Sequence, residues 1–424
     1  MELFYGSAIQ IAECQSPQAC SRTSTVQPQN RRPDQHVELQ SLTPLRGMAA
    51  LWVVLYHYTV LYFPSIHPET YTHFIEKGYL AVDMFFVLSG FVLAHVYRDA
   101  FVDDPESHYW KFFSARVARL YPLHIFVLTL FLATALAARA VDYAATGKFA
   151  PIPWEGARSV GAFVANLFML QGLKASELSW NYPAWSISIE FLAYLVFPFA
   201  LLRIWRARRA AKVALGFLLL GMLVWLAYWT KDNFNQWDGP KTLLRCLPEF
   251  VGGMILYNFY ARRQLPFILR SDFLFAGIAA ALIVLLHFGA DDLLIIMLLP
   301  VVVLAAVMNT GYAGKLLNIL PLIWLGQISY SLYLIHGFVQ FVTTRLLAMS
   351  DVPDKSDLSV ASSIALALAM LFASVCLAAM TYYGVEKIGR RYLRKMLGVQ
   401  ARRRTAAVVP EPIPARSQPG APRG

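Results

Sequence analysis

Charged side chains and cysteines are scarce in this sequence, and the glycine motifs of nucleotide-binding proteins are missing. Only 15% of the 424 residues are charged while 57% are hydrophobic, which excludes a soluble protein of two or three domains. The four cysteines are Cys14, Cys20, Cys246 and Cys376. Their spacing fits neither a metal site nor a disulfide scaffold. Because no Walker or Rossmann motif is present either, we expect no metal and no nucleotide-binding domain.

A signal peptide and an internal repeat are also missing. Residues 1–43 are polar and rich in Gln, Ser, Pro and Arg, without the apolar core and cleavage site of a signal peptide. We expect them to form a disordered cytoplasmic tail, with a second such tail at 396–424. The net charge is +11, but most basic residues lie in short segments between apolar runs. Membrane topology explains that distribution, so we expect no nucleic-acid partner.

Long apolar runs are abundant instead, and ten of them can cross a hydrocarbon core about 30 Å thick. They cover about residues 45–64, 79–97, 119–139, 186–204, 211–230, 243–260, 272–288, 292–309, 322–346 and 358–383. The sequence therefore predicts an all-α, polytopic membrane protein with about ten transmembrane helices in the lipid bilayer. Its transmembrane domain would cover residues 44–395.

The connections between these runs alternate in charge, which predicts their orientation. Lys and Arg are frequent in 98–118, 203–212, 261–270 and the segment after Glu386, and sparse in 65–78, 231–242, 289–291 and 347–357. Because cytoplasmic loops carry the basic excess, both termini should be cytoplasmic. The interval 140–185 contains a short apolar piece, 160–170, which we expect to lie at the outer interface or to re-enter the membrane.

Several polar side chains fall inside the runs, where they are costly and often functional. Arg46 and His57 are almost three helical turns apart, so they share one face and stand about 16 Å apart along the axis. A membrane-edge anchor with a helix-packing histidine explains this pair equally well. Four other runs carry polar residues in or near their outer halves: Asp83, Ser89, Glu190, Arg245, Glu249, Tyr330 and His336. Together they predict a polar cavity open to the outside.

Each of these outer residues also has a structural explanation. Arg245 and Glu249 are four positions apart and could form an ion pair within one helix. Asp83 and Glu190 lie close enough to the outer surface for interfacial hydration. His336 could serve only helix packing, and Ser89 with its following glycine could allow close helix approach.

The inner side carries a cluster of arginines. Arg116 and Arg119 lie on one face at the start of the third run, beside the cytoplasmic mouth where Arg46 enters. They are either ordinary membrane anchors or a cationic funnel for a phosphorylated ligand, because guanidinium groups match phosphate oxygens in bidentate geometry.

Six motifs in this order resemble the integral-membrane acyltransferase family 3: LRGMAALWVVLYH, VDMFFVLSGF, RVARLYP, WSISIEF, RCLPEFVGG and ISYSLYLIH. The resemblance covers about residues 40–395. Members of this family O-acetylate lipopolysaccharide, exopolysaccharide, Nod factors and macrolides, usually with acetyl-CoA. The resemblance implies about ten spans, cytoplasmic termini and a place in the bacterial cytoplasmic (inner) membrane.

The family's functional residues carry over onto this sequence one by one. Its arginine and histidine pair falls on Arg46 and His57, and its arginine pair before a Tyr-Pro falls on Arg116 and Arg119. Its glutamate after the Trp-Ser signature falls on Glu190.

These observations combine into one hypothesis, an O-acyltransferase that acts on a glycan or glycolipid. Arg46, Arg116 and Arg119 would hold the phosphates of acyl-CoA, a co-substrate rather than a permanently bound cofactor. His57 would be the general base that takes the proton of the acceptor hydroxyl, either in direct transfer or with an acyl-histidine intermediate. Asp83 or Glu190 would orient its imidazole. Five residues would line the substrate cavity: Ser89, Arg245, Glu249, Tyr330 and His336.

A proton-coupled secondary transporter or flippase of a glycan or other small molecule is the alternative. His57, Asp83 and Glu190 would then relay protons. This alternative explains the inner arginines less well, and no repeated halves support it.

Overall fold

The computed structural model describes residues 39, 41–147, 156–173, 179–230, 234, 239–350, 355 and 358–399. Every regular element in these ranges is a helix. The expected tails at 1–43 and 396–424 lie almost entirely outside the described residues. The first helix begins at Leu42 and the last ends at Met396. The all-α class is therefore confirmed for the described part of the chain.

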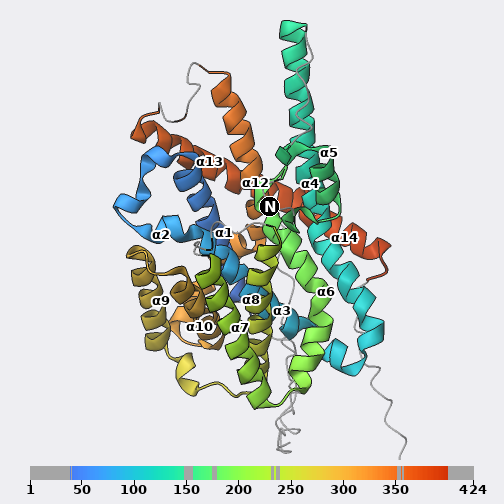
Figure 1. Ribbon diagram of the computed structural model, residues 1–424, viewed down its shortest axis with the longest axis vertical. Coiled ribbons are helices and arrows are strands. Elements are labelled where there is room, and N and C mark those ends of the chain that lie inside the picture. Colours follow the sequence, from blue (N-terminus) through green and yellow to red (C-terminus); the bar gives the residue numbers. More distant parts are fainter. Residues whose placement is uncertain are drawn as a thin grey trace, which may run out of the picture. The chain divides into compact units, whose positions relative to one another are not determined.

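The helices follow one another with short connections (Figure 1). The first half contains α1 (Leu42–Tyr56), α2 (His73–Glu76), α3 (Ala81–Asp103), α4 (Pro105–Thr146), α5 (Val160–Leu167), α6 (Trp185–Arg206) and α7 (Arg209–Thr230). The second half contains α8 (Pro240–Ala261), α9 (Asp272–His287), α10 (Asp292–Met308), α11 (Tyr312–Leu317), α12 (Leu320–Ala348), α13 (Val360–Thr381) and α14 (Lys387–Met396).

All ten predicted runs coincide with helices, but fewer helices are long and apolar enough to cross a membrane. Among the described residues six qualify, and a seventh qualifies if Leu42–Tyr62 and Pro64–Thr70, which bend by 93°, form one broken span. Helices α9 and α10 are apolar but short, and α8 carries Arg245 and Glu249 in its interior. The protein is thus a multi-span integral membrane protein, while ten complete spans and cytoplasmic termini stay predictions.

The segment 98–118, expected as a cytoplasmic loop, is almost entirely helical. Helix α3 continues to Asp103, and α4 begins at Pro105. Asp104 caps α4, since its side chain accepts a hydrogen bond from the Ser107 amide at 3.2 Å. An aspartate before a proline is a strong helix-start signal, so the loop prediction was wrong because it weighed charge above capping. Helix α5 is too short to cross, as expected for 160–170.

Helices α3 and α8 approach so closely that only glycine fits between their backbones. A Cβ atom on Gly90 would lie 1.9 Å from the Phe250 carbonyl oxygen. One on Gly253 would lie 2.2 Å from the Val87 carbonyl oxygen. Small residues permit this close packing between membrane helices, where van der Waals contact replaces the hydrophobic effect. In Figure 1 these two helices lie beside α6 and α7, below the position of α1.

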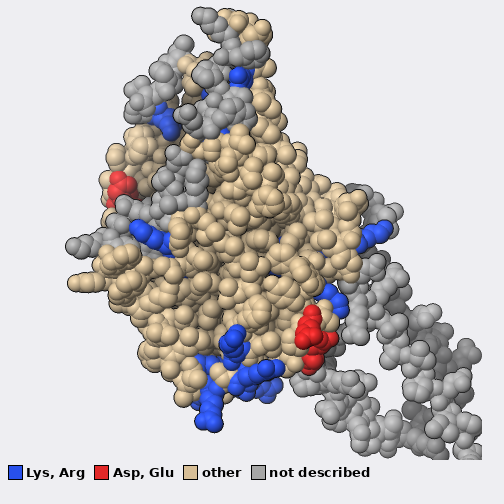
Figure 2. Space-filling view, turned by 45° about the vertical axis from the view of Figure 1, so that its right-hand side comes forward, with Lys and Arg blue, Asp and Glu red and all other residues tan. Residues whose placement is uncertain are grey.

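The molecular surface also fits a membrane environment. Figure 2 shows a face that is almost free of charge, with Lys and Arg gathered at its lower end. The α6–α7 and α8–α9 turns lie at the lower end of Figure 1 and carry exposed arginines: Arg206, Arg208, Arg209, Arg262, Arg263 and Arg270. These turns are the basic connections 203–212 and 261–270 that predicted the cytoplasmic side.

Two adjacent glycines of α8 test this packing. We expect Gly253→Ala to lower stability by about 1–3 kcal/mol, because its Cβ meets the α3 backbone. Gly252→Ala is the control, since a Cβ there meets nothing within 4 Å and alanine favours a helix. Thermal unfolding of the two detergent-purified variants measures the difference. Equal midpoints would contradict the close approach of α3 and α8.

Candidate active site

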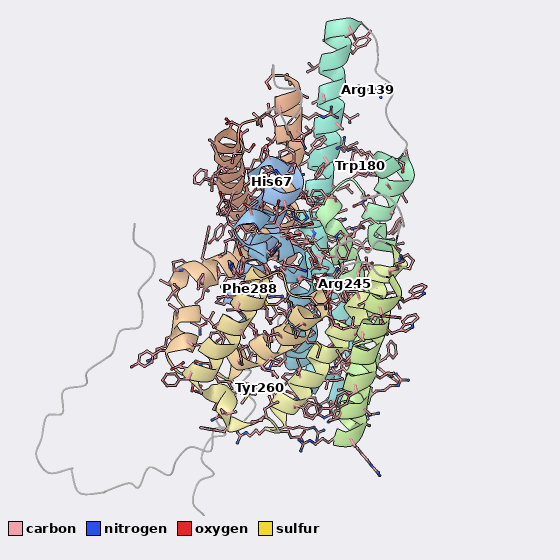
Figure 3. The ribbon with its side chains drawn as sticks, turned by 60° about the vertical axis from the view of Figure 1, so that its left-hand side comes forward. His67, Arg139, Trp180, Arg245, Tyr260 and Phe288 are labelled. Atoms are coloured by element: carbon pink, nitrogen blue, oxygen red, sulfur yellow. The ribbon has the colours of Figure 1, made fainter. Side chains whose placement is uncertain are left out.

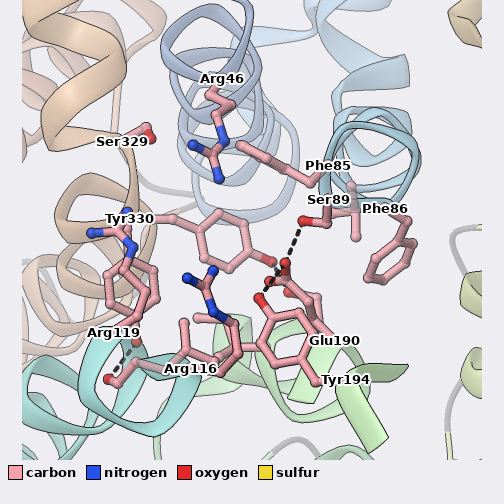
Figure 4. Close-up of a pocket in the computed structure, with 15 residues that line it drawn as sticks. Arg46, Phe85, Phe86, Ser89, Arg116, Arg119, Glu190, Tyr194, Ser329 and Tyr330 are labelled. Atoms are coloured by element: carbon pink, nitrogen blue, oxygen red, sulfur yellow. Dashed lines mark hydrogen bonds between the residues drawn. The ribbon is translucent and has the colours of Figure 1, made fainter. Parts of the chain in front are cut away.

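A cavity of about 80 Å³ lies among α1, α3, α4, α6 and α12, and we call it the arginine cavity. Its walls include three arginines, one from α1 and two from α4: Arg46, Arg116 and Arg119. Figure 4 shows the guanidinium group of Arg46 above that of Arg116, with Arg119 beside them. The Arg119 guanidinium lies 5.3 Å from the centre of the Tyr330 ring. The three arginines thus converge on one point, as the sequence predicted.

The three arginines differ in how far their charges are compensated. Arg119 forms an ion pair with Glu386, which is buried and also accepts a hydrogen bond from Ser331 at 2.8 Å. Arg116 donates to the Tyr97 hydroxyl at 3.0 Å, but its Nε is buried without a partner. Among the described residues, no hydrogen bond or ion pair holds Arg46. Two of the three cations are therefore available to an anionic ligand.

Glu190 lies in the arginine cavity as well. It accepts hydrogen bonds from Ser89 of α3 and from Tyr194, the latter at 2.8 Å. Ser186, one turn earlier on α6, lines the same cavity and bonds to the Tyr333 hydroxyl at 2.7 Å. Ser186 and Glu190, which are four positions apart, thus share the face of α6 that lines this cavity.

The depth expected for Glu190 was wrong, however. The sequence placed it in an outer layer, apart from the arginines, whereas the structure places it in one cavity with Arg46. Apolar run boundaries do not fix how far a helix is shifted along the membrane normal or tilted, because packing against neighbouring helices sets both.

His57 lies just outside the arginine cavity, at the start of a π-helical segment, His57–Tyr62. Its Nδ1 lies 2.9 Å from the carbonyl oxygen of Val53. Because a carbonyl only accepts, Nδ1 carries the hydrogen, and Nε2 is the basic nitrogen of the neutral ring. π-Helical turns within helices often mark functional sites, because they turn a side chain out of the regular register.

Neither carboxylate expected to orient His57 bonds to it. Asp83 bonds to Arg245, and Glu190 bonds to Ser89 and Tyr194. The expectation is corrected: the backbone carbonyl of Val53 takes the orienting role, as often happens for histidine.

Aromatic rings surround His57 instead. Its ring centre lies 5.0 Å from that of Tyr182 and 5.0 Å from that of His336. His336 is fully buried, its Nε2 has no hydrogen-bond partner, and its ring lies 5.7 Å from that of Tyr333 in the arginine cavity wall. His336 therefore lies between His57 and the cavity rather than in the cavity lining where we expected it.

Asp83, Arg245 and Glu249 form a separate buried cluster. Arg245 Nε donates to Asp83 at 2.6 Å, and a second bond makes the pair bidentate. Asp83 is 0% and Arg245 2% exposed, and Figure 3 shows Arg245 among the helices. Both Glu249 oxygens are buried without a hydrogen-bond partner. The expected pair between Arg245 and Glu249 was wrong, because the α3–α8 contact brings a carboxylate from another helix to the guanidinium.

This cluster continues into a polar network that joins α3 and α8 to α10. Arg245 donates to the Phe234 carbonyl oxygen at 2.5 Å, and the Phe234 amide donates to Asp292 at 3.1 Å. Asp292 also accepts from Lys77 at 2.5 Å and from Tyr79 at 2.7 Å. Arg245 and Glu249 line neither described cavity, contrary to the expectation, and the bonds of Arg245 join α8 to α3 and to Phe234.

A second cavity, of about 370 Å³, lies beside Tyr182, and we call it the outer cavity because part of its lining comes from the interval 140–185, which the sequence predicts on the outer side. Tyr182, which contacts the His57 ring, lines it together with Arg158, Trp180, Gln340, Phe341 and Arg345. Figure 3 places Trp180 toward the end of the bundle that carries His67, opposite to Tyr260. His57 is therefore one aromatic ring away from the outer cavity and two rings away from the arginine cavity.

Sequence reasoning missed several residues of these sites. Glu386 was read only as the start of a basic inner segment, although a lone acid after an apolar run was a visible signal. Tyr194 lies one turn after Glu190 on α6, so helical spacing could have found it. Arg158 lies in the interval 140–185, where no periodicity indicated a site.

Helices long and apolar enough to cross a membrane, with buried polar cavities at their centre, define an integral membrane protein with an internal site. Residues 39–383 match the family described as acyltransferase domain. The chain therefore belongs to the acyltransferase 3 family and is an acyl-transferring enzyme.

Three named relatives agree with this assignment. Acyltransferase MdmB of Streptomyces mycarofaciens is 28% identical over 410 residues, 90% of this chain and 97% of MdmB. O-acetyltransferase OatA of Staphylococcus aureus is 25% identical over 329 residues, 70% of this chain and 50% of OatA. Putative peptidoglycan O-acetyltransferase YrhL of Bacillus subtilis is 24% identical over 354 residues, 73% of this chain and 50% of YrhL. The chain thus spans about half the length of the last two. No solved structure gives a significant match.

The buried ion pair yields a prediction that separates structure from catalysis. We expect Asp83→Leu to lower stability by about 3–5 kcal/mol, because Arg245 is left buried and unpaired. Arg245→Leu should do the same to Asp83. The double variant should recover most of the folded yield, measured by size-exclusion chromatography and thermal unfolding in detergent. A double variant no more stable than either single one would contradict the structural role.

Proposed function

We propose that this enzyme moves an acyl group, usually acetyl, from cytoplasmic acyl-CoA to a hydroxyl of a cell-surface or lipid-linked carbohydrate. Its place would be the bacterial cytoplasmic membrane. The observation that carries the proposal is the position of His57, whose ring contacts Tyr182 of the outer cavity and His336, with Nδ1 bound to Val53 and Nε2 without a hydrogen bond among the described residues. Both cavities contain arginines and aromatic side chains.

The arginine cavity supports the donor side of the proposal. Its arginines can form bidentate bonds with the phosphates of acyl-CoA, and the buried Nε of Arg116 lacks a partner that such a ligand would supply. Because Arg119 is already paired with Glu386, we assign the phosphate contacts first to Arg46 and Arg116. The acyl arm would then approach His57 past Tyr333 and His336.

The chemical step needs one base. Nε2 of His57 takes the proton of the acceptor hydroxyl while the hydroxyl oxygen attacks the thioester carbonyl carbon. The new C–O bond forms, the C–S bond breaks, and the CoA thiolate leaves. The imidazolium then returns its proton to the thiolate, which restores neutral His57. An acyl-histidine route would use the same nitrogen as the nucleophile.

Replacement of the base gives the first functional prediction. We expect His57→Ala to remain folded and to lower acyl transfer at least about 100-fold, because general-base catalysis contributes about 10²–10⁴-fold. The assay measures CoA released by purified protein from acetyl-CoA with an oligosaccharide mixture. His108→Ala is the control, since His108 lies near the start of α4 and lines neither described cavity. Wild-type transfer by His57→Ala would refute the assignment. Substrate accumulation in vesicles without CoA release would favour a transporter.

Substitutions of Arg46, Arg116 and Arg119 should have two kinds of effect, on acyl transfer or on stability. We expect Arg116→Gln to raise the KM for acetyl-CoA about tenfold through a lost phosphate contact. Arg46→Lys should also impair transfer, because an ammonium lacks the guanidinium fork. Arg119→Gln should instead lower the unfolding temperature, because Glu386 then stays buried without its partner. Initial rates and thermal unfolding distinguish them. An unchanged KM in Arg46→Lys and Arg116→Gln would contradict the donor site.

A further inference from the structure

Two arginines in the outer cavity share one aromatic ring. The Arg158 guanidinium lies 4.5 Å from the centre of the Phe341 ring, and the Arg345 guanidinium lies 5.5 Å from the same centre. Phe341 is buried and belongs to α12, whereas Arg158 ends the short helical turn Gly156–Arg158 before α5. The ring therefore fixes two positive charges from distant parts of the chain at one wall of the cavity.

No acid compensates these charges in the part of the chain that the structure describes. Neither Arg158 nor Arg345 forms an ion pair or a hydrogen bond with a described residue. Burial, and then the neighbouring charge of Arg345, lower the pKa of the half-buried Arg158, so the two like charges repel each other. A guanidinium nevertheless stays charged at neutral pH. An anion that binds in the cavity would therefore relieve the repulsion between the two guanidinium groups.

The other walls suit a carbohydrate. Trp180 and Tyr182 contribute aromatic rings to the lining, and Gln340 accepts a hydrogen bond from the Tyr182 hydroxyl at 2.8 Å. Trp180 is only 6% exposed, and its Nε1 donates to the Ser159 carbonyl oxygen at 3.4 Å, which holds the indole in place. A sugar is an amphipathic ring with few rotatable bonds. Rigid aromatic rings beside amides and hydroxyls are the groups that bind such a ring.

The outer cavity also connects to the catalytic histidine. Tyr182 lines it and lies 5.0 Å from His57, ring centre to ring centre. Gly337 lines it too and follows His336 directly on α12. A molecule held by the two arginines therefore lies in a cavity whose wall residue Tyr182 contacts the His57 ring.

We propose that the outer cavity binds the acceptor through an anionic group, a carboxylate or a phosphate, which Arg158 and Arg345 hold while a hydroxyl of the same molecule reaches His57. This inference rests on the proposed function and narrows its substrate class to negatively charged glycans or glycan phosphates. The anionic group would decide which acceptors bind and would position the reacting hydroxyl. The two guanidinium groups hold the anion in one place, which fixes its distance from the reacting hydroxyl.

Binding of matched sugars to the detergent-purified full-length protein tests this proposal. The carboxylate arm compares trigalacturonate with its neutral methyl ester, and the phosphate arm compares maltotriose 1-phosphate with maltotriose. We expect at least one charged probe to bind about tenfold more tightly than its neutral partner, and Arg158→Gln or Arg345→Gln to remove that difference. Arg270→Gln is the control, because Arg270 also stacks on a phenylalanine, Phe267, but lines neither cavity.

The outcomes separate this inference from the proposed function. Equal affinity for charged and neutral sugars, or charge-dependent binding that survives both glutamine variants, would overturn the inference. Competition by phosphatidylglycerol vesicles without charge-dependent sugar binding would assign the arginines to a lipid headgroup and overturn it as well. CoA release from acetyl-CoA is measured in parallel. Its absence with every sugar would count against the proposed function, whereas equal release with charged and neutral sugars would count only against the inference.

Discussion

The burial of opposite charges between α3 and α8 is the constraint on which the rest of the structure depends. Asp83 and Arg245 are almost fully buried, and an unpaired charge in their place would cost several kcal/mol. The two helices can meet this cost only where their backbones touch, which Gly90 and Gly253 permit. With α3 fixed in this way, Ser89 is held where it can bond to Glu190 of α6.

The cost of burying a charge without a partner also explains how the two cavities differ. In the arginine cavity, Glu386 compensates Arg119 through an ion pair, while Arg46 and Arg116 form no ion pair with a described residue. Such charges persist in a membrane protein where a ligand or water completes their environment. His57 carries no such cost, because the neutral imidazole needs only one backbone acceptor for its hydrogen. The proposed base therefore lies among aromatic rings, next to the outer cavity.

The sequence predicted the helical fold well, because long apolar runs are a local property. It also identified Arg46, Arg116 and Glu190, which share one cavity. It failed for Arg245, whose partner comes from a distant segment: the acid lies on α3 and not four residues along α8. It also failed for the orienting group of His57, which is a nearby backbone carbonyl and not a side chain. Helical spacing reports which residues share a face, but it does not report which face of another helix lies opposite.

Sidedness is the most direct test of the account. Full-length protein is reconstituted in sealed proteoliposomes with chitotriose and trigalacturonate trapped inside and acetyl-CoA added outside. The account predicts acetylated sugar inside and free CoA outside, because the donor and the acceptor would reach His57 from two different cavities. Acetylation only when acetyl-CoA and the sugar share one compartment would contradict it.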